Sequence, residues 1–239
     1  MDQPEFLFGG DERFTLVLTL LRRVLHDLNN PISTIDSSAG FLLSVDADPE
    51  RRRRMLEIIQ AEARRLKSMT ASMGQLTRAE KPRPVPMLAQ ALVSRLTLDH
   101  RAGLSAVGIQ FELEPPPETL QTEVFTDQAL VSFVVGNLLT NARQAIKASA
   151  TEGRIRLELL VGPAFLDLEV ADSGPGIPPA FEPHLFQAFR SGRENGLGLG
   201  LYVSQQAAAS MHADLSLVTP RDPALGGARF RLRIPRRAL

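Results

Sequence analysis

A histidine flanked by an acid and amides stands in an otherwise apolar-striped stretch of this chain. His26 is followed directly by Asp27, and Asn30 lies one helical turn further on. A neutral imidazole is a nucleophile near neutral pH, and a neighbouring carboxylate can orient the ring and accept its proton. Taken alone, His26 is more simply interpreted as an ordinary surface histidine. Evidence for a chemical role has to come from the rest of the chain.

A second set of polar residues lies more than a hundred positions downstream. Asn137 and Asn141 are one helical turn apart, so they share a face, and amide oxygens suit Mg²⁺ beside phosphate oxygens. Asp172 follows an apolar run typical of a strand, which places its carboxylate at a strand end. There it can accept a hydrogen bond from an exocyclic amine such as that of adenine.

Two glycine clusters complete this set. Gly174 and Gly176 permit tight backbone turns and the close approach of a flat base. Gly196, Gly198 and Gly200 directly precede an expected helix, whose free N–H groups and dipole favour phosphate. Each cluster alone could be a plain turn, and the spacing matches neither the dinucleotide fingerprint nor a P-loop. All the pieces in this order predict a nucleotide site.

The first part of the chain predicts a helical hairpin. Apolar residues recur at alternating steps of four and three from 14 to 42, and at mostly three- and four-residue steps within 50–78, with a short connection between. Such a connection makes the two helices antiparallel neighbours. Two helices cannot bury two such seams, so we predict a homodimer with a four-helix bundle. The alternative is that the seam packs on the chain's own second half.

The second part predicts an α+β sandwich, one sheet covered by helices. Alternate prolines within 81–86 exclude helix and indicate a linker. The expected domains are an N-terminal segment 1–13, a hairpin 14–80, the linker 81–86 and a second domain 87–239. The expected helices of that domain are 87–102, 127–149 and one after Gly200, and its expected strands are 107–114, 154–161, 165–171, 214–218 and 228–234.

The composition narrows the classes of partner. Of 239 residues, 44% are apolar, none is cysteine, and 27 basic residues balance 27 acidic ones. Disulfides and thiolate metal sites are therefore excluded, and no global field favours nucleic acid. No apolar run reaches the roughly 20 residues that cross a bilayer, so we expect no membrane insertion and a cytoplasmic protein. Arg51–Arg54 is interpreted as a solvated helical turn, and His100, His184 and His212 as structural.

In this order, the motifs resemble those of a two-component sensor histidine kinase core. The resemblance covers nearly the whole chain from about residue 14. Residues 25–31 are similar to the phosphoacceptor box, 137–141 to the N box, 172–176 to the first glycine box, 181–189 to the F box, 196–201 to the second glycine box and 227–230 to the closing glycine motif.

The resemblance implies a dimerisation and phosphotransfer hairpin followed by an ATP-binding domain of the GHKL (Bergerat) type, shared with Hsp90, gyrase and MutL. It implies that adenine binds Asp172, that Asn141 is the main Mg²⁺ ligand with Asn137 assisting, and that 181–195 forms a lid over the phosphates. The γ-phosphoryl group would pass to His26, with Asp27 orienting the ring.

The same resemblance implies a response regulator receiver domain as the phosphoryl acceptor. Asn30 matches the position that would align a water for dephosphorylating that regulator, so a bifunctional enzyme is expected. With few residues before the first helix, the signal is expected from a separate sensory partner, from those residues or from a part absent here.

Two alternatives stay open. The first is a relay or phosphatase with a vestigial ATP domain, which Leu197 and Gln144 favour slightly because they depart from the family pattern. The second is an ATP-driven clamp, which would need a glutamate where Asn137 stands.

Overall fold

The chain folds into two compact units, and the division between them falls inside one helix. The computed structural model describes residues 10–44, 48–79, 82–149, 152–188, 190 and 198–237. The first unit is Met1–Ala71 and the second is Ser72–Leu239.

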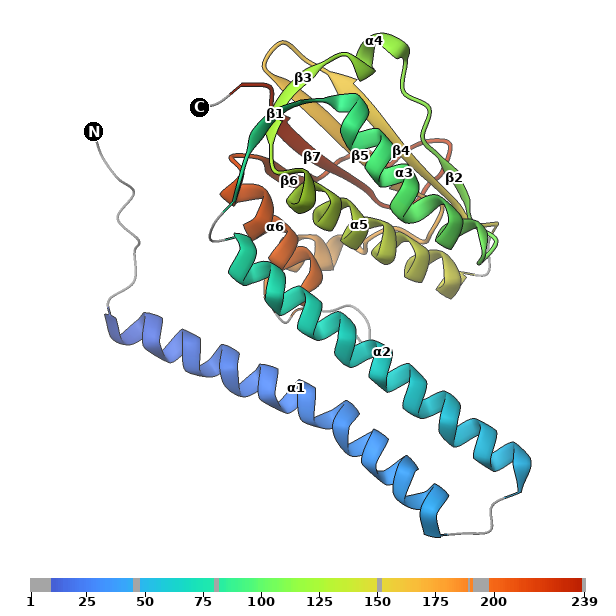
Figure 1. The fold of residues 1–239 in the computed structure, drawn as a ribbon. Helices are drawn as coiled ribbons and strands as arrows, with labels where there is room; N and C mark the ends of the chain where they lie inside the picture. Colours follow the sequence, from blue (N-terminus) through green and yellow to red (C-terminus); the bar gives the residue numbers. More distant parts are fainter. Residues whose placement is uncertain are drawn as a thin grey trace. The chain divides into compact units, whose positions relative to one another are not determined.

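The first unit is a helical hairpin (Figure 1). Its helices are α1, Gly10–Ser44, and α2, Pro49–Ala79, as the apolar periodicity predicts. Asp48 caps α2, because its Oδ1 accepts the backbone N–H groups of Glu50 and Arg51, each at 3.0 Å. The proline at the first helical position has no N–H to satisfy, which suits this end of a helix.

Large apolar side chains along this hairpin are exposed. Leu25, Ile32 and Leu56 are about half exposed, at 52%, 50% and 53%, and Leu43 is 90% exposed. Arg51–Arg54 are exposed as well, which agrees with their interpretation as a solvated turn. Several apolar side chains of the two helices are therefore left uncovered.

The second unit is built on a five-stranded sheet in the order β2-β4-β5-β7-β6. The edge strand β2 runs parallel to β4, and all other neighbours are antiparallel. The strands are β2, Gln110–Glu112; β4, Arg154–Val161; β5, Phe165–Asp172; β6, Asp214–Leu217; and β7, Arg229–Pro235.

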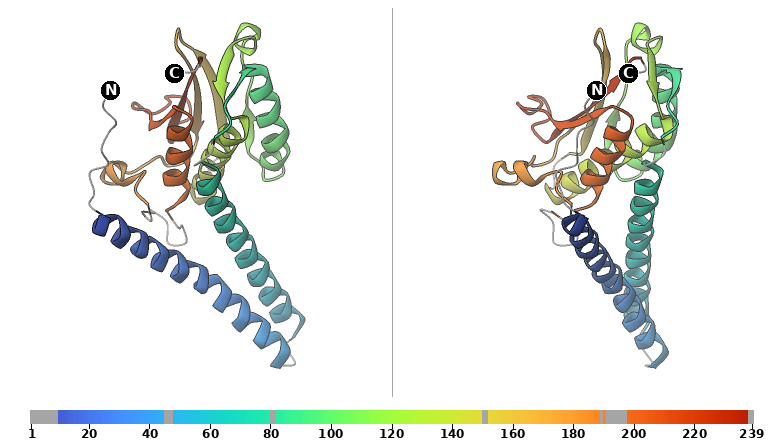
Figure 2. Two further views of the ribbon diagram at one scale, coloured as in Figure 1. Left: turned by 60° about the vertical axis from the view of Figure 1, so that its left-hand side comes forward. Right: turned by 90° about the vertical axis from the view of Figure 1, so that its left-hand side faces the viewer.

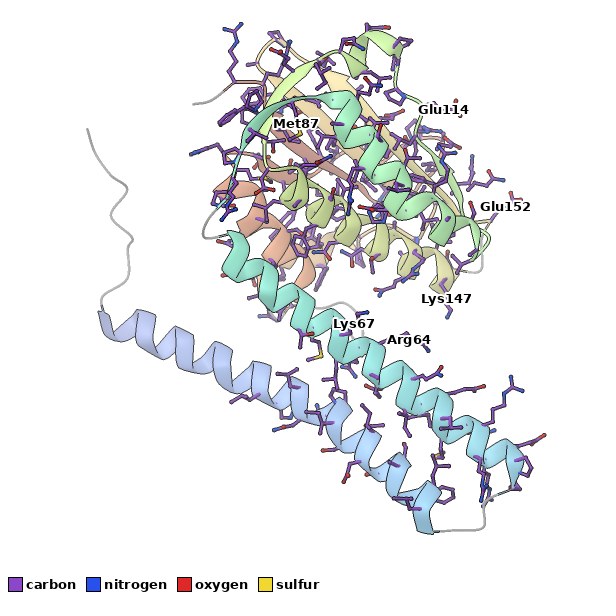
Figure 3. The ribbon with its side chains drawn as sticks, in the orientation of Figure 1. Arg64, Lys67, Met87, Glu114, Lys147 and Glu152 are labelled. Carbon is purple, nitrogen blue, oxygen red and sulfur yellow. The ribbon has the colours of Figure 1, made fainter. Side chains whose placement is uncertain are left out.

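Three helices cover one face of this sheet, as the views in Figure 2 show. They are α3, Ala89–Ser105; α5, Gln128–Ser149; and α6, Gly200–Ser210. Their inward side chains and those of the sheet form one apolar core. The expected α+β sandwich is therefore confirmed. Two polar residues at the edge of this unit, Lys147 in the last turn of α5 and Glu152 just before β4, are exposed (Figure 3).

The opposite face of the sheet carries ion pairs between β5 and β7. Glu169 is only 1% exposed, and its two oxygens accept from Nε of Arg229 at 2.6 Å and of Arg231 at 2.7 Å. Asp167 binds Arg233 through two parallel bonds, Nε at 2.8 Å and an Nη2 at 2.7 Å. These bonds raise the pKa of Arg233. The pairs cross between β5 and β7, so they hold these two strands together.

Several elements differ from the sequence-based expectation. A two-stranded antiparallel sheet joins β1, Val85–Leu88, to β3, Glu123–Thr126, and neither strand was predicted. β1 includes Pro86 and overlaps the expected linker 81–86, and α3 begins at Ala89 rather than 87. A short helix α4, Pro117–Leu120, and a 3₁₀ helix η1, Pro179–His184, were also not predicted. The expected strand 107–114 shrinks to β2, because Gly108 turns the chain at φ +74°.

His100 lies on α3, and its ring packs against Gly136 of α5. A Cβ added at Gly136 would lie 3.3 Å from its ring carbon Cε1, and Nε2 is buried with no hydrogen-bond partner among the described residues. Burial lowers the pKa of His100 from its ordinary 6.5, with a smaller opposing effect of Asp99 and a further lowering by Arg95. The folded protein therefore favours the neutral imidazole.

We expect this histidine to make the second unit less stable in acid. Because the folded pKa lies below 6.5, the unfolded chain takes up the proton first, and stability falls as the pH drops below 6.5 towards the folded pKa. In His100→Leu this part of the decline should disappear, whereas His212→Asn, at an exposed position, should keep it. Thermal melts between pH 8 and pH 5 measure the difference, and equal slopes in all three proteins would contradict it.

Candidate functional site

Asp172 is the last residue of β5, and its carboxylate is held in place by backbone groups. Oδ1 accepts from the N–H of Gly174 at 2.8 Å and from that of Ala228 at 3.4 Å, and the residue is 4% exposed. Its own N–H donates to the Ala228 carbonyl at 3.0 Å, and its carbonyl accepts from Gly227 at 3.0 Å. This end of β5, where we predicted a ligand, is therefore held by hydrogen bonds on both the main chain and the side chain. We call Asp172 together with Gly174, Gly227 and Ala228 the Asp172 corner.

Two glycines make this corner possible. A Cβ at Gly227 would overlap both the carbonyl oxygen and Oδ1 of Asp172. A Cβ at Gly174 would come within 2.8 Å of the same Oδ1 and 3.0 Å of the Ala145 methyl on α5. Both positions therefore need glycine because neighbouring atoms occupy the space of a side chain.

Gly176 turns the chain beyond Asp172, and an arginine from the β6–β7 connection lies over it. Its φ is +76°, and a Cβ there would lie 2.5 Å from the Arg221 guanidinium. Arg221 donates to the carbonyls of Pro175 at 3.2 Å and Ile177 at 2.8 Å. Sequence reasoning missed this arginine, since a single arginine in a loop carries no pattern that sets it apart.

Asn137 of α5 lies on the side of this helix that faces α6. The Asn137 Nδ2 donates to the Ser204 hydroxyl at 3.0 Å and to the Gly200 carbonyl at 3.4 Å. A carbonyl can only accept, so the nitrogen of this amide is the atom that faces α6, and the oxygen is the other branch. Asn141, one turn on, is half-buried. Ser204 was not predicted to be part of the site.

Of the second glycine cluster, which consists of Gly196, Gly198 and Gly200, the structure describes Gly198 and Gly200. Gly198 has φ +64°, and a Cβ there would overlap the Arg190 backbone. Gly200 is the first residue of α6 and has open space around it. Gly196, Leu197 and much of the expected lid over 181–195 lie outside the described residues.

The start of the expected lid is anchored to the core. Leu185 is buried, and Phe186 packs edge to face on Phe230 of β7, with ring centroids 6.4 Å apart. An edge-to-face pair of this kind adds stability beyond its buried area. Leu185 and Phe186, which directly follow η1, are therefore held against the core of the second unit.

His26, the histidine that we predicted to be reactive, belongs to the first unit. His26 lies on α1 and is exposed, and Asn30 is exposed one turn along the same helix. Asp27 lies on α1 too, but its side chain is outside the described part. The helix continues through Pro31, which has no N–H to donate, and the Thr34 hydroxyl bonds the Asn30 carbonyl at 3.1 Å.

The described residues contain no group of three or more histidines, cysteines or carboxylates that could hold a metal. A metal at the second unit would therefore depend on amide oxygens and on the oxygens of a ligand, which fits the pair Asn137 and Asn141. None of the helices in the described ranges combines the length and apolar character needed to span a bilayer.

Two family models match the chain in succession. The "His Kinase A (phospho-acceptor) domain" matches residues 17–82, and the "Histidine kinase-, DNA gyrase B-, and HSP90-like ATPase" matches residues 126–238. The first match includes the described His26 helix, and the second includes the Asp172 corner.

Full-length relatives agree with these matches. The sensor protein kinase PilS of Pseudomonas aeruginosa is 27% identical over 211 residues, covering 87% of this chain and 39% of the relative. The sensory histidine kinase/phosphatase NtrB of Rhodobacter capsulatus is 29% identical over 225 residues, covering 88% of this chain and 59% of the relative. The chain thus spans about two fifths to three fifths of these relatives.

Solved structures show the same fold. The Acinetobacter baumannii histidine kinase AdeS superposes with a TM-score of 0.66 at 18% identity, over 89% of this chain and 98% of that one. Histidine kinase ThkA, solved in complex with the response regulator protein TrrA, superposes at 0.74 and 22% identity, over 95% of this chain and 64% of that one.

We expect Gly227→Ala to disrupt the Asp172 corner. The new methyl group would overlap Asp172, so the carboxylate has to move, and binding of an adenine nucleotide should weaken by at least about tenfold, because misplacing one buried charged hydrogen bond costs roughly 1.5–3 kcal/mol. Isothermal titration with ADP measures the change. Gly103→Ala is the matched control, since this helical glycine has open space around it, and equal binding by both variants would contradict the prediction.

Proposed function

The chain belongs to the two-component sensor histidine kinases, whose phosphoacceptor and ATPase domains it carries in order, and we propose that it is an ATP-dependent protein histidine kinase. In this reaction His26 takes the γ-phosphoryl group of ATP and passes it to an aspartate of a response regulator. The observation that carries the proposal is the buried Asp172 corner, a built site for a base, in one chain with an exposed histidine on a phosphoacceptor helix.

The nucleotide end of the mechanism depends on Asp172. Two N–H groups fix Oδ1, so the carboxylate keeps one orientation and can accept from the exocyclic amine of adenine. A fixed acceptor discriminates against a base that presents a carbonyl there, since two acceptors would face each other. Asp172 therefore selects adenine, and Gly174 and Gly176 let the base approach the backbone.

The phosphate end depends on α5 and α6. Gly198 and Gly200 lead into the N-terminus of α6, where backbone N–H groups and the helix dipole stabilise negative charge. Asn141, assisted by Asn137, would hold Mg²⁺ through amide oxygens. The ion would neutralise charge on the phosphates. The hydrogen bonds from the Asn137 Nδ2 to α6 fix the orientation of this amide, with its oxygen on the branch that does not face α6.

The acceptor end depends on His26. The neutral imidazole attacks the γ-phosphorus, the bond to the leaving ADP oxygen breaks, and the ring proton is lost as the N–P bond forms. Asp27, the next residue, would orient the ring and take this proton. Because His26 is exposed, its ring is accessible from solvent, as transfer to and from a separate group requires.

The partner in this proposal is a receiver domain. ThkA, whose structure holds the regulator TrrA, shares the fold of this chain, and NtrB is described as a kinase and a phosphatase. Asn30 is exposed one turn from His26, where its amide can align a water against the regulator's acyl phosphate. We therefore include regulator dephosphorylation in the proposed function.

The proposal also includes a homodimer. The first unit leaves Leu25, Ile32, Leu43 and Leu56 about half exposed or more. An exposed apolar stripe of this kind is typical of a helix face that packs on another chain. A second copy of the hairpin would complete a four-helix bundle.

We expect phosphorylation of His26 itself. Incubation with γ-labelled ATP and Mg²⁺ should give label on the protein that is stable in alkali and lost in acid, and His26→Ala should abolish it. His212→Asn is the control, because that histidine is exposed and lies at the end of α6, and it should keep full labelling. Free phosphate without labelled protein would indicate an ATP-driven clamp, and neither product would leave a relay protein.

Asn30→Ala should separate two activities. Labelling of His26 should stay within about twofold, whereas dephosphorylation of the cognate regulator should fall by about a hundredfold or more, within the usual contribution of a positioned proton-transfer or water-orienting group. Ser33→Ala, at an exposed position on the same helix, is the control. Equal loss of both activities in Asn30→Ala would contradict a separate phosphatase role.

A further inference from the structure

We propose that Arg221 is a positioning residue of the nucleotide site, which clamps the glycine segment 174–177 from the side of the β6–β7 connection. This inference rests on the proposed function, because it concerns the same site. It assigns to the connection between β6 and β7 a role in holding the base end of that site.

The clamp consists of two hydrogen bonds from one guanidinium. Arg221 Nη1 donates to the Pro175 carbonyl at 3.2 Å, and Nη2 donates to the Ile177 carbonyl at 2.8 Å. The two carbonyls lie on either side of Gly176, so the planar guanidinium spans the turn. A planar group with fixed donors can hold both at once, which a lysine ammonium cannot do with the same geometry.

Gly176 is adapted to this contact. The three atoms nearest to a Cβ built there all belong to the Arg221 guanidinium, the closest at 2.5 Å. The positive φ of +76° is a second reason for glycine. The turn and the arginine therefore fit each other, since any side chain at 176 would displace the guanidinium.

Arg221 can act as a clamp because its own loop is held to the sheet. The next residue, Asp222, is 6% exposed, and its Oδ1 accepts from the N–H groups of Ala224 at 2.8 Å and Leu225 at 3.0 Å. Its Oδ2 lies 3.3 Å from Nη1 of Arg156 on β4. The loop is thus anchored directly beside Arg221.

The same connection supplies Gly227 and Ala228, which hold Asp172. The glycine segment is therefore tied to it twice, at its start through the Asp172 corner and at its middle through Arg221. A segment fixed before the ligand arrives loses less conformational entropy on binding, and this preorganisation strengthens affinity. The phosphate end of the site has no contact with Arg221 among those described here.

The test compares Arg221→Ala with Arg154→Ala. Arg154 is the matched control, because it donates to the Ala224 carbonyl at 3.2 Å in the same loop and has no side-chain bond to the glycine segment among the described contacts. Isothermal titration should show that Arg221→Ala binds ADP about tenfold more weakly, and Arg221→Lys by an intermediate factor, since charge-assisted hydrogen bonds are the stronger kind. Arg154→Ala should bind within about twofold of the parent.

Kinetics give a second readout. In autophosphorylation, the KM for ATP should rise in Arg221→Ala while kcat at saturation stays within about twofold, because the clamp acts at the base end only. A fall in kcat with unchanged KM would overturn the proposal. Equal loss of ADP affinity in Arg221→Ala and Arg154→Ala would overturn it as well, since the loop rather than the clamp would then be responsible.

Hydrogen exchange tests the clamp without any nucleotide. In the ligand-free protein, Arg221→Ala should speed exchange of the Ser173 and Gly174 amides, which donate to the Arg154 carbonyl and to Asp172 Oδ1, while exchange within β4 stays at the parent rate. Faster exchange in a protein that binds no ADP at all would support the clamp and reject the proposed kinase. Unchanged exchange at these amides would overturn the clamp even if ADP binds normally.

A double-mutant cycle gives the last check. Gly176→Ala should weaken ADP binding in the parent, because the methyl group displaces the guanidinium and the positive φ is strained, and it should weaken binding less in the Arg221→Ala background, where only the positive φ opposes it. Coupling of this kind is expected of residues in contact. Additive effects would show that the two residues do not act on each other.

Discussion

The contact between the end of β5 and the segment before β7 is the constraint on which the proposed site depends. Asp172 exchanges backbone hydrogen bonds with Ala228 and Gly227, and the same two strands are paired along their length. A shift of register by one residue would turn Asp172 to the other face and move its carboxylate away from the N–H groups that hold it. The position of the acceptor for the base is therefore set by strand pairing, and the glycines follow from how closely the two segments approach.

The polar face of the sheet reinforces that register. Glu169 is buried, and a buried carboxylate is destabilising unless it is fully paired. Its bonds to Arg229 and Arg231 therefore favour the one register of β5 and β7 in which both bonds form. Asp167 and Arg233 repeat the pairing two residues away, nearer the start of β5. Helices on one face and ion pairs on the other thus hold the same two strands, and the Asp172 corner lies at the end of this pairing.

Much of the fold could be predicted because its signals are periodic. The apolar steps of α1 and α2, the long helix α5 and the strands β4, β5 and β7 each carry a pattern that extends over seven residues or more. β1, β3 and α4 have only four residues each, too short for a period to show, and Pro86 in β1 argues locally against a strand. Tertiary pairing decides such segments, and pairing between residues 85 and 126 is not visible in either stretch alone.

The residues of the candidate site also fall into those that the sequence could predict and those that it could not. Asp172, Gly174, Gly176, Asn137 and Asn141 could be selected because residue type and spacing recur as motifs. Arg221 and Ser204 could not, because each acts across the fold on a motif residue more than forty positions away and carries no local pattern. The residues proposed to contact the nucleotide could thus be selected from the sequence, whereas the residues that hold them in place could not.

The two proposed activities place different demands on these two units. Phosphorylation of His26 needs the nucleotide domain, whereas alignment of a water by Asn30 needs only the helix α1 and a regulator. A change that loosens the Asp172 corner therefore weakens the first activity and leaves the residues of the second in place.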